Sequence, residues 1–487
     1  MFSRKTKTSM ADETQDITAN GETSPTEHYG STSQKSDENH LELEEIYEMI
    51  GLGPTQYLYW LMVLLVVYSD YAELTLLSVI LPILRCEWGL SATFETAITI
   101  SVYGSYALLA AVFGRVADIY GRKKVVIWST LFLLLAAILG ATSPNKWVLL
   151  VSRLLTGACI GINTSVVMCY ATEIAESRYR TYGVTTVVLG SFVGVSAVNG
   201  MAFLFLRIVG WRWFIMLVST PALPALVLIL VLPESPRFLC VSGQQDKAME
   251  AVRIMAKLNG RELPDNIQMA CFENEELGSY STVLNKEHRK SIIALSVIYF
   301  SNILIEFGLI VLLPLIFSSD MCGAAHSVTH ECRLLSQDDL WKITIATVGS
   351  IFGTIAALFL AERIGRLVPI RVASFAMLLS IGCLFACVNE TFTFVNSTIA
   401  KILEAFINVT VWIMIPESFP TNIRSTATGF INGWGKTGGV LGTAFVYLLF
   451  YVSPYSVLGL FLFFSLVGLV AILIYDRETK YEVLREI

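Results

Sequence analysis

The sequence predicts an all-α membrane protein with twelve transmembrane helices, arranged as two six-helix bundles. Three observations predict this fold. The chain of 487 residues is 54% hydrophobic and only 15% charged, whereas a soluble domain usually carries about 25% charged residues. The charged residues are concentrated between long apolar runs. Short motifs in the first half of the chain also recur at corresponding places in the second half.

Each apolar run is long enough to cross a bilayer. A crossing takes roughly 20 mostly apolar residues, because lipid offers no hydrogen-bond partner to the backbone. The first run extends from Leu58 to Leu81, and the others start near Ala97, Val125, Trp147, Val184, Trp213, Ile292, Ile343, Val368, Ser397, Ala427 and Ser456. These runs predict one six-helix bundle over residues 51–233 and a second over residues 291–475.

The remaining segments are polar. Residues 1–40 are rich in Ser, Thr, Glu and Asp, so residues 1–50 are predicted to be a disordered acidic N-terminus, either a solvated end or a regulatory tail. Residues 234–290 are predicted to form a linker with short helices, and residues 476–487 a tail. Lys and Arg are frequent in every second connection, for example at Arg122, Lys123 and Arg237. By the positive-inside rule both termini and the linker are expected to be cytoplasmic.

Two cysteines lie in the polar loop that follows the seventh predicted helix. Cys322 and Cys332 share this loop on the expected non-cytoplasmic side, where a disulfide would form in an oxidising lumen or outside the cell. Two free thiols are the alternative. His326 and His330 lie between them, but their spacing matches no strong zinc pattern, so no metal site is predicted.

Three signatures repeat between the two halves. GRVADIYGRKK (114–124) follows the second helix and LAERIGR (360–366) follows the eighth. YATEIAESRYR ends the fourth helix and PESFPTNIRS ends the tenth. PESPRFL (233–239) follows the sixth helix and DRETK (476–480) follows the twelfth. Such repetition argues for a duplicated unit.

These repeated motifs carry charges that can act as a gate. Asp118 and Arg122 flank a tight turn and can latch onto the end of another helix, while Glu173 with Arg178, Glu234 with Arg237 and Glu417 with Arg424 offer further pairs. Such pairs can close the cytoplasmic side in one state and break in the other. The alternative is that they only hold the topology. The full predicted gate comprises Gly114, Asp118, Gly121, Arg122, Glu173, Arg178, Glu234, Arg237, Glu362, Arg363, Glu417 and Arg424.

The motif at residues 114–124, the glycines that follow Arg153 (Gly157 and Gly161) and PESPR together resemble the sugar-porter and organic-ion branches of the major facilitator superfamily. More narrowly, the chain from about residue 41 onward is similar to the synaptic vesicle glycoprotein 2 family and its related-protein branch. The segments that carry this resemblance are EEIYEMIGLG (44–53), YSDYAELTLLSVILP (68–82), CEW (86–88), DMCG (320–323) and GFINGWGKTGGVLG (429–442). The short loop after the seventh helix favours the related-protein branch. The resemblance implies a major facilitator fold in a vesicle or plasma membrane.

A few ionisable residues lie inside the predicted spans. Each costs about 2.5 kcal/mol or more at mid-membrane, so such residues usually have a function and a partner. Asp70 and Glu73 share a face of the first helix. Two neighbouring carboxylates disfavour double ionisation, so one can carry a proton, and the family that the chain resembles has the same acid pair. The predicted proton-coupling residues are Asp70, Glu73, Arg153 and Glu306; a fixed salt bridge to Arg153 is the alternative.

Lys436 indicates the substrate. It lies in a Gly-rich helix, and in the organic-ion transporters that the sequence resembles a basic residue at this place accompanies anionic substrates. Glu306, where the family generally has an aromatic residue, could instead neutralise Lys436, take part in proton coupling, or select zwitterions or cations. The predicted substrate-binding residues are Lys436, Tyr71, Asn163, Asn302, Phe307, Asn408, Trp412 and Trp434. Each polar or aromatic member has helix packing as its alternative role.

The sequence contains no P-loop, no nucleophile motif and no HExxH, so neither an enzyme nor ATP-driven transport is predicted. We expect a proton-coupled secondary carrier of a small organic anion of the carboxylate type. The alternatives are a carrier of an organic cation, a zwitterion or a sugar, or a vesicle-membrane binding protein with little transport. The expected partners are a small organic ion, protons and the bilayer, with no nucleic acid and no cofactor. The protein is expected to be a monomer.

Overall fold

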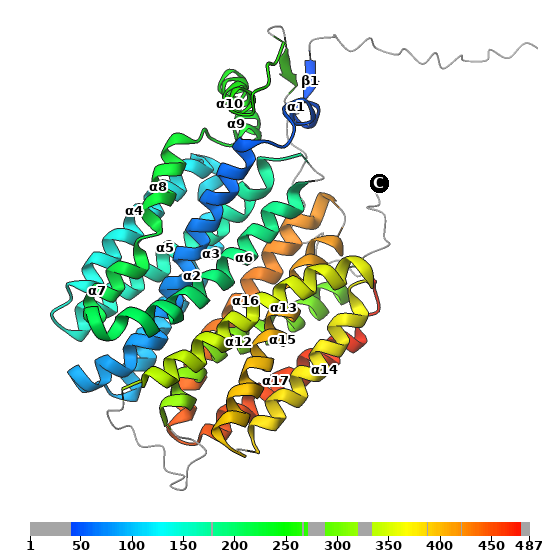
Figure 1. The fold of residues 1–487 in the computed structure, drawn as a ribbon. Coiled ribbons are helices and arrows are strands. Elements are labelled where there is room, and N and C mark those ends of the chain that lie inside the picture. Colours follow the sequence, from blue (N-terminus) through cyan, green and yellow to red (C-terminus); the bar gives the residue numbers. More distant parts are fainter. Residues whose placement is uncertain are drawn as a thin grey trace, which may run out of the picture.

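Two bundles of six spanning helices lie side by side (Figure 1). The computed structural model describes residues 40–176, 179–264, 267–270, 288–319, 334–386, 388–419 and 421–478. Within these residues, 9 helical stretches are long and apolar enough to cross a membrane, and the stretch Tyr182–Val231, with 50 residues, contains two crossings. The long helices α3 and α16 complete the twelve. The predicted all-α fold with twelve spanning helices is confirmed.

The first bundle contains helices α2 to α8. Its spans are α2 (Pro54–Trp88), α3 (Ala92–Tyr120), α4 (Arg122–Ala141), α5 (Lys146–Glu173) and α6 (Arg180–Met201) with its extension η2 (Ala202–Leu206), and then α7 (Arg207–Ser219) with α8 (Ala222–Val231). The chain reverses between the fifth and sixth spans at Gly210, whose φ of 75° is readily adopted only by glycine. The side chain of Asn145 caps α5 by accepting hydrogen bonds from the backbone N–H groups of Trp147 and Val148.

The second bundle repeats this order with α12 to α17. Its spans are α12 (Arg289–Ser319), α13 (Gln337–Arg363), α14 (Leu367–Leu384), α15 (Glu390–Glu417), α16 (Thr421–Phe450) and α17 (Pro454–Ile474). Helices α15 and α16 start earlier than the apolar runs at Ser397 and Ala427 predict. Helix α15 starts directly after Asn389, whose side chain caps it by accepting the amide N–H of Phe392, so the cap and not hydropathy sets this boundary.

A small helical layer covers one end of the first bundle. It consists of α1 (Leu43–Ile50), α9 (Pro236–Val241) and α10 (Gln245–Leu258), with strand β1 (His40–Glu42) paired in parallel with β2 (Gln268–Ala270). We call this end of the molecule the linker side and the opposite end the far side. The predicted disorder of residues 1–50 is wrong for residues 40–50. Their apolar side chains Ile46, Tyr47 and Ile50 are fully covered in the same core cluster as α10.

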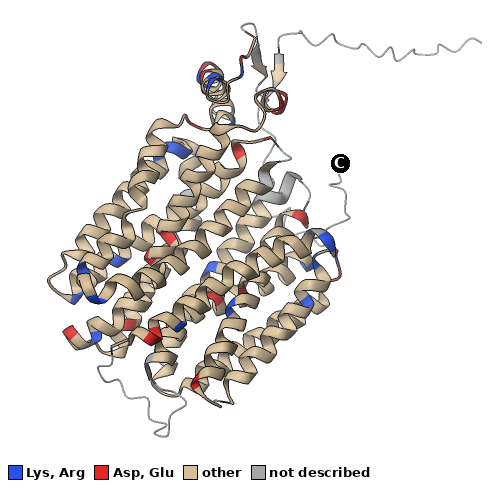
Figure 2. Ribbon diagram, viewed as in Figure 1, with Lys and Arg blue, Asp and Glu red and all other residues tan. Residues whose placement is uncertain are grey.

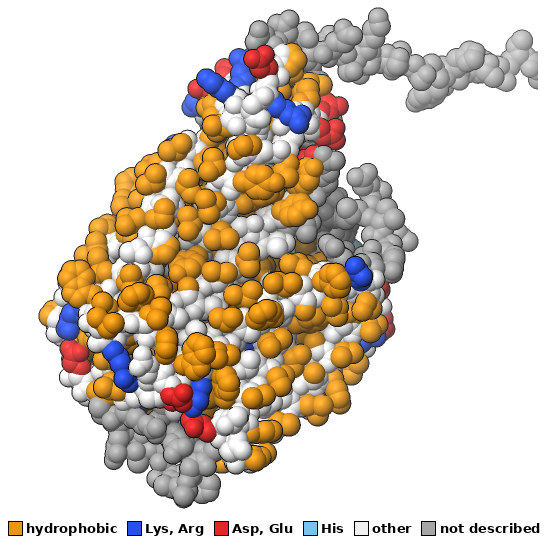
Figure 3. Space-filling view, viewed as in Figure 1, with side chains coloured by type: hydrophobic (Ala, Val, Ile, Leu, Met, Phe, Trp, Pro, Cys, Tyr) orange, Lys and Arg blue, Asp and Glu red, His pale blue; other side chains and the backbone are white. Residues whose placement is uncertain are grey.

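The surface of the bundles suits a lipid environment. Exposed apolar side chains cover the sides of the bundle (Figure 3), while Lys, Arg, Asp and Glu gather at its two ends and at a few places inside (Figure 2). The two bundles pack against each other through α3 with α16, α6 with α13, and α2 with α12. The few internal charges lie near this junction, and the candidate site is built there.

Candidate functional site

A cavity lies between the two bundles, and both bundles contribute to its wall. Helices α2, α3, α5 and α6 supply one side, and α12, α15 and α16 supply the other. Its volume is only about 50 Å³, enough for a few water molecules and far below the roughly 300–1,000 Å³ of a ligand pocket. The cavity is therefore closed around its centre. Its lining residues are Tyr71, Tyr106, Thr164, Met168, Val187, Val188, Ser191, Tyr299, Glu306, Asn408, Trp412, Asn432 and Lys436.

Aromatic rings fill the middle of this junction. The ring of Phe307 lies 5.2 Å from that of Tyr103, 6.3 Å from that of Tyr71 and 6.4 Å from that of Tyr106, centroid to centroid. Tyr299 stacks edge to face on Trp412 at 5.8 Å. Because Phe307 belongs to the second bundle and the three tyrosines to the first, it is an aromatic plug across the junction.

The Gly-rich segment of α16 allows this packing. A Cβ atom at Gly439 would lie 2.5 Å from the Phe307 ring, and one at Gly435 would lie 2.2 Å from the Tyr299 ring. Both distances are shorter than any real Cβ contact. The glycines thus allow close approach of α16 to α12 within one continuous helix.

The two carboxylates of α2 have different partners. Glu73 forms a fully buried ion pair with Arg153, with 2.8 Å between the Glu73 Oε2 and Arg153 Nη1 atoms, and it also accepts a hydrogen bond from Ser219. Asp70 accepts a hydrogen bond of 3.0 Å from the amide of Asn163. For Glu73 the structure therefore shows the fixed salt bridge that was the alternative to proton coupling. Asp70 has no direct ionic partner among the described residues.

The second bundle carries a similar arrangement. Lys401 and Glu404 form a buried ion pair on α15, with 2.9 Å between Nζ and Oε2. Glu306 on α12 accepts a hydrogen bond from the amide of Asn408. In the middle of its described spans, each bundle thus holds one buried ion pair and one further carboxyl that is bonded to an asparagine. Glu404 was not among the predicted site residues, although its place three positions after Lys401 on a helix was a usable signal.

Lys436 extends from the second bundle toward the first. It is 9% exposed, and its Nζ lies 4.6 Å from the centroid of the Tyr106 ring. Its charge interacts with that of Asp70, across the junction. Among the described residues no ion pair joins Lys436 to Glu306, although both line the cavity.

The other predicted binding residues divide into three groups. Tyr71, Asn408 and Trp412 line the cavity. Phe307 and Asn163 lie behind the lining, the latter as the partner of Asp70. Asn302 instead lines a separate small pocket beside α17, and Trp434 is 50% exposed and packs on Phe300, so both predictions of cavity contact are wrong. The lining residues that the sequence analysis missed include Tyr106, Tyr299, Thr164, Ser191 and Asn432.

On the linker side of the first bundle, charges join helix ends. Arg122 forms an ion pair with Glu173 at 3.0 Å, and Ser235 donates a hydrogen bond of 2.7 Å to the same carboxylate. Glu234 accepts the backbone N–H of Lys123 at 3.0 Å. Burial raises the pKa of the Glu234 carboxyl above its ordinary value, while hydrogen bonds from the backbone of Lys123 and Ser235 oppose this rise.

The second bundle repeats this pattern at a constant spacing. Arg366 forms an ion pair with Glu417 at 2.8 Å, and Glu478 accepts the backbone N–H groups of Arg366 and Leu367 at 2.9 and 3.0 Å. Each residue of this pattern in the first bundle has its counterpart 244 positions later in the sequence. The arginine is at 122 and 366, the glutamate paired with it is at 173 and 417, and the glutamate that accepts backbone N–H groups is at 234 and 478. The predicted duplication is thus present as matching hydrogen bonds. The signal for Arg366, which the predicted gate omitted, was its place in the LAERIGR motif.

Several predicted gate pairs differ from the observed ones. Glu234 bonds to backbone amides instead of Arg237, and Arg237 pairs with Glu44 at 2.6 Å. Arg363 packs on the ring of Phe359. Gly121 is confirmed as the tight turn before α4, with a φ of 99°. Arg178 lies outside the described residues, and the structure does not describe the side-chain surroundings of Gly114, Asp118, Glu362 and Arg424.

On the far side a charged cluster connects the two bundles. Arg85 and Glu95 form a two-point ion pair in the first bundle, with nitrogen to oxygen distances of 2.7 and 2.8 Å. Tyr451 of the second bundle donates its hydroxyl to Glu95 at 3.4 Å and places its ring 5.1 Å from the Arg85 guanidinium. Nearby, Arg207 donates to the carbonyl of Leu335, also across the junction. We call Arg85, Glu95 and Tyr451 the far-side clamp.

The cysteines give one further observation. The predicted pair Cys322 and Cys332 lies outside the described residues. Cys86, at the far-side end of α2, and Cys240, in α9, are both disulfide-bonded. The sequence analysis did not predict a bond for either cysteine.

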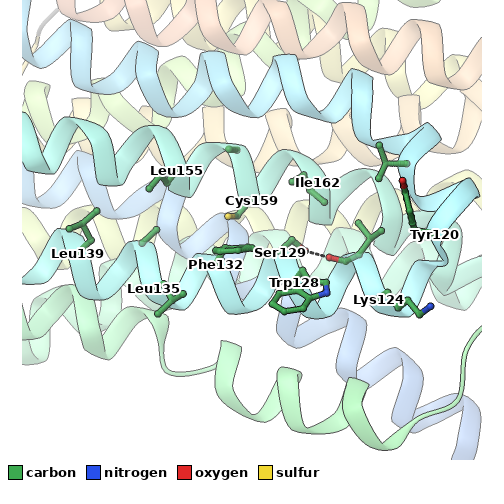
Figure 4. A pocket seen from close by; sticks show the side chains of 14 residues that line it. Tyr120, Lys124, Trp128, Ser129, Phe132, Leu135, Leu139, Leu155, Cys159 and Ile162 are labelled. Carbon is green, nitrogen blue, oxygen red and sulfur yellow. Dashed lines mark hydrogen bonds between the residues drawn. The ribbon is translucent and has the colours of Figure 1, made fainter.

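A larger pocket of about 650 Å³ opens on the outer face of the first bundle, among α3, α4 and α5 (Figure 4). Its wall is apolar, with Phe132, Leu135 and Leu155 prominent. It faces away from the junction and contains none of the buried carboxylates, so it is a lipid-facing hollow and not the transport cavity. Ser129 on its floor donates to Asn163, the partner of Asp70.

The chain matches the family described as "Sugar (and other) transporter" over residues 26–487. It is 28% identical to synaptic vesicle 2-related protein of Pongo abelii over 91% of this chain and 82% of the relative. The protein of that name from Rattus norvegicus is 27% identical over 91% and 82%.

Two solved structures share the fold. The proton:xylose symporter XylE bound to 6-bromo-6-deoxy-D-glucose has a TM-score of 0.64 at 17% identity, covering 89% of this chain and 98% of that one. A partially occluded inward-open structure of XylE from E. coli has a TM-score of 0.64 at 15% identity, covering 88% and 99%. At these identities the likeness concerns the fold alone.

Proposed function

The chain belongs to the sugar (and other) transporter family, and from this premise we propose that it is a secondary active carrier that moves a small organic anion, of the carboxylate type, together with protons. Transport proceeds by alternating access, with the two bundles rocking around the central cavity. One observation carries the proposal. Lys436, in the cavity wall, forms no ion pair among the described residues, and the one carboxylate charge that acts on it is that of Asp70 in the opposite bundle.

This placement supports coupling between protons and an anion. When Asp70 is ionised, it supplies the counter-charge that a buried lysine needs. When Asp70 accepts a proton, Lys436 loses that counter-charge, and an organic anion in the cavity can supply it instead. Proton binding and anion binding then favour each other by the same factor, because such linkage is reciprocal. The two ions therefore travel in the same direction.

A count of buried charges supports a second proton-binding group. In the middle of the described spans there are four carboxyls and three cations, with Glu73 paired to Arg153 and Glu404 paired to Lys401. Lys436 can balance only one of the two remaining carboxyls, Asp70 and Glu306. An unpaired charge in this setting costs several kcal/mol, so the other carboxyl is favoured in its neutral, protonated form. We assign proton binding to Asp70 and Glu306, and an orienting role to Glu73 and Arg153.

The contacts around the cavity support alternating access. The far-side clamp joins the two bundles. On the linker side, the ion pairs Arg122 with Glu173 and Arg366 with Glu417 each stay within one bundle. Such a distribution lets the bundles separate on the linker side while they remain closed on the far side. The high content of Lys and Arg on the linker side favours a cytoplasmic orientation of that side, in a vesicle or plasma membrane.

The test is transport by the purified protein in proteoliposomes. Radiolabelled mono- and dicarboxylates are offered with and without an imposed pH gradient, with a neutral sugar and an organic cation as parallel arms. We expect at least one carboxylate to accumulate only when the gradient is present. Accumulation of the sugar or the cation, with no carboxylate transported, would exclude the anion proposal. Absence of transport in every arm would favour a membrane binding protein.

The variant Asp70→Asn tests the coupling itself. It imitates the protonated residue, so anion binding should become tighter and lose the pH dependence that Asp70 contributes, and exchange of internal for external anion should persist. Accumulation driven by the pH gradient should be lost. Asp338→Asn, at an exposed aspartate at the start of α13, is the matched control and should behave as the parent. An Asp70→Asn protein that still concentrates the anion would disprove the role of Asp70.

A further inference from the structure

A second hollow lies on the lipid-facing surface of the second bundle. It runs between α12 and α17 on the linker side, with a volume of about 870 Å³. We call it the α12–α17 groove. It lies outside the central cavity and shares no lining residue with it. Its apolar wall is formed by Ile293, Ala294, Val297, Leu466, Val470 and Ile474.

The wall of the groove is apolar and open to the surroundings. Ile293 is 55% exposed, Val470 is 46% exposed and Ile474 is 70% exposed. From Leu466 to Ile474 the wall follows α17 for about 12 Å at 1.5 Å per residue. This length is close to the ~15 Å thickness of one leaflet of the hydrocarbon core. The groove therefore has the dimensions and chemistry of a site for a lipid acyl chain.

The end of the groove nearest the linker side is basic. Arg289 and Lys290, at the start of α12, are exposed, and no ion pair or hydrogen bond satisfies either side chain among the described residues. Arg477 lies beside them and also donates to the carbonyl of Ser418 at 3.2 Å. Among the described lining residues the one acid is Asp476, whose side chain is 91% exposed and lies 4.0 Å from that of Arg371, a residue outside the lining. The described side chains at the groove mouth thus carry a net positive charge.

We propose that the α12–α17 groove binds an anionic phospholipid. One acyl chain lies along the apolar wall between the two helices. The phosphate and the acidic headgroup lie at the mouth, where Arg289, Lys290 and Arg477 supply the opposite charge. Basic clusters between spanning helices at the interface suit acidic lipid headgroups in this way, since each cation near the anionic headgroup contributes separately. A zwitterionic lipid offers the same chain but a weaker match to the mouth.

Such a lipid bridges the first and last helices of the second bundle. Helix α12 carries Tyr299 and Glu306 of the central cavity, so the lipid stabilises a helix that forms part of the cavity wall. A ligand that binds only the folded state raises the unfolding temperature by mass action. Binding is therefore measurable without knowledge of the transported substrate.

The experiment uses the full chain, purified in detergent and freed of lipid. Phosphatidylserine or phosphatidylcholine is titrated into it, and binding is followed by native mass spectrometry and by the unfolding temperature. We expect phosphatidylserine to bind and to raise the unfolding temperature more than phosphatidylcholine. Equal effects of the two lipids would overturn the proposal. Water-soluble glycerophosphoserine should have no effect at the same concentration, and an equal effect of it would show a site for the headgroup alone.

Variants locate the site. Arg289→Gln with Lys290→Gln should weaken phosphatidylserine binding roughly 25-fold, about fivefold for each cation. Lys247→Gln with Lys257→Gln removes the same charge from α10, away from the groove, and should leave binding unchanged. Arg289→Lys with Lys290→Arg keeps the charge and should keep most of the affinity. Ala294→Trp should block the chain while leaving the mouth intact. Loss of binding in the α10 control would place the lipid elsewhere. Full binding in both the Arg289→Gln with Lys290→Gln protein and the Ala294→Trp protein would also place it elsewhere.

Discussion

At the scale of single residues, Lys436 and Asp70 are the pair on which the site depends. A buried lysine needs a counter-charge. Lys436 lies 4.6 Å from the Tyr106 ring of the opposite bundle, and its charge interacts with that of Asp70 in the same bundle as Tyr106. Glu73 lies one turn from Asp70 on the same helix but is held by Arg153 and Ser219. The difference between these two carboxylates comes entirely from their partners.

Substitution of Lys436 tests whether the substrate supplies a counter-charge during transport. Lys436→Ala should weaken anion binding by roughly 1.5–3 kcal/mol, the range for a hydrogen bond to a charged group. Lys436→Arg should keep part of the affinity, because the charge remains while the geometry changes. Isothermal titration or scintillation proximity binding measures both, with Lys247→Ala in α10 as the control.

The same variants separate a binding role from a structural one. If Lys436 serves only to neutralise Asp70, Lys436→Ala should lower the unfolding temperature, and adding Asp70→Asn should restore it. Full anion affinity in Lys436→Glu would contradict the substrate role outright.

At the scale of helices, the repeated charge pairs fix the linker-side ends within each bundle. The pair Arg122 with Glu173 is only 13% and 11% exposed, and Arg366 with Glu417 is 13% and 30% exposed. Arg237 with Glu44 is 35% and 34% exposed. Burial reduces solvent screening, so the first two pairs should contribute more to stability than the third.

Double-mutant cycles measure this difference. For the first pair, the cycle compares Arg122→Ala, Glu173→Ala and the double variant. It should give a coupling free energy of about 1–2 kcal/mol, between the values for exposed ion pairs and for hydrogen bonds to charged groups. The corresponding cycle for Arg366 and Glu417 should give a similar value. The cycle for Arg237 and Glu44 should give about 0.2–1 kcal/mol. Equal coupling energies in all three cycles would show that burial does not decide their strength.

At the scale of the whole molecule, the far-side clamp holds one face closed while the cavity remains small. A cavity of about 50 Å³ cannot admit a metabolite, so transport requires the bundles to separate on one side at a time. Two contacts of the clamp cross the junction, the hydrogen bond from Tyr451 to Glu95 and the contact of the Tyr451 ring with Arg85, and the ion pair within the first bundle holds both partners of Tyr451 in place. Its removal should favour opening toward the far side.

Tyr451→Ala tests this expectation. It removes both the hydroxyl donor to Glu95 and the ring over Arg85, so the far-side-open state should become more populated. A cysteine introduced at Ser191, which lines the cavity, should then react several-fold faster with a membrane-impermeant thiol reagent applied from the far side. Tyr455→Ala, at a neighbouring tyrosine outside the clamp, should not change this rate. An unchanged rate in Tyr451→Ala would show that the clamp does not set the closed face.

The sequence by itself determined the twelve spans and their division into two halves. It also identified most of the charged residues that lie inside the spans. These features are local, since a span needs an unbroken apolar run and a buried charge stands out within it. Local geometry could also have excluded Trp434 from the cavity: residues two apart on a helix do not share a face, and Lys436 faces inward. The ordered helix at residues 43–50 was missed because its apolar face is short and is buried in a core formed by residues that are distant in the sequence.

Only the tertiary structure decided which of these charges meet. Asp70 and Lys436 lie near opposite ends of the chain, and their proximity depends on how α2 and α16 rotate and pack across the junction. The same holds for Glu73 with Arg153, for Glu306 with Asn408, and for the far-side clamp. An apolar pattern tells which residues lie in the membrane, because every span meets the same lipid. It leaves open which neighbours a side chain faces, because that depends on the packing of all twelve helices together.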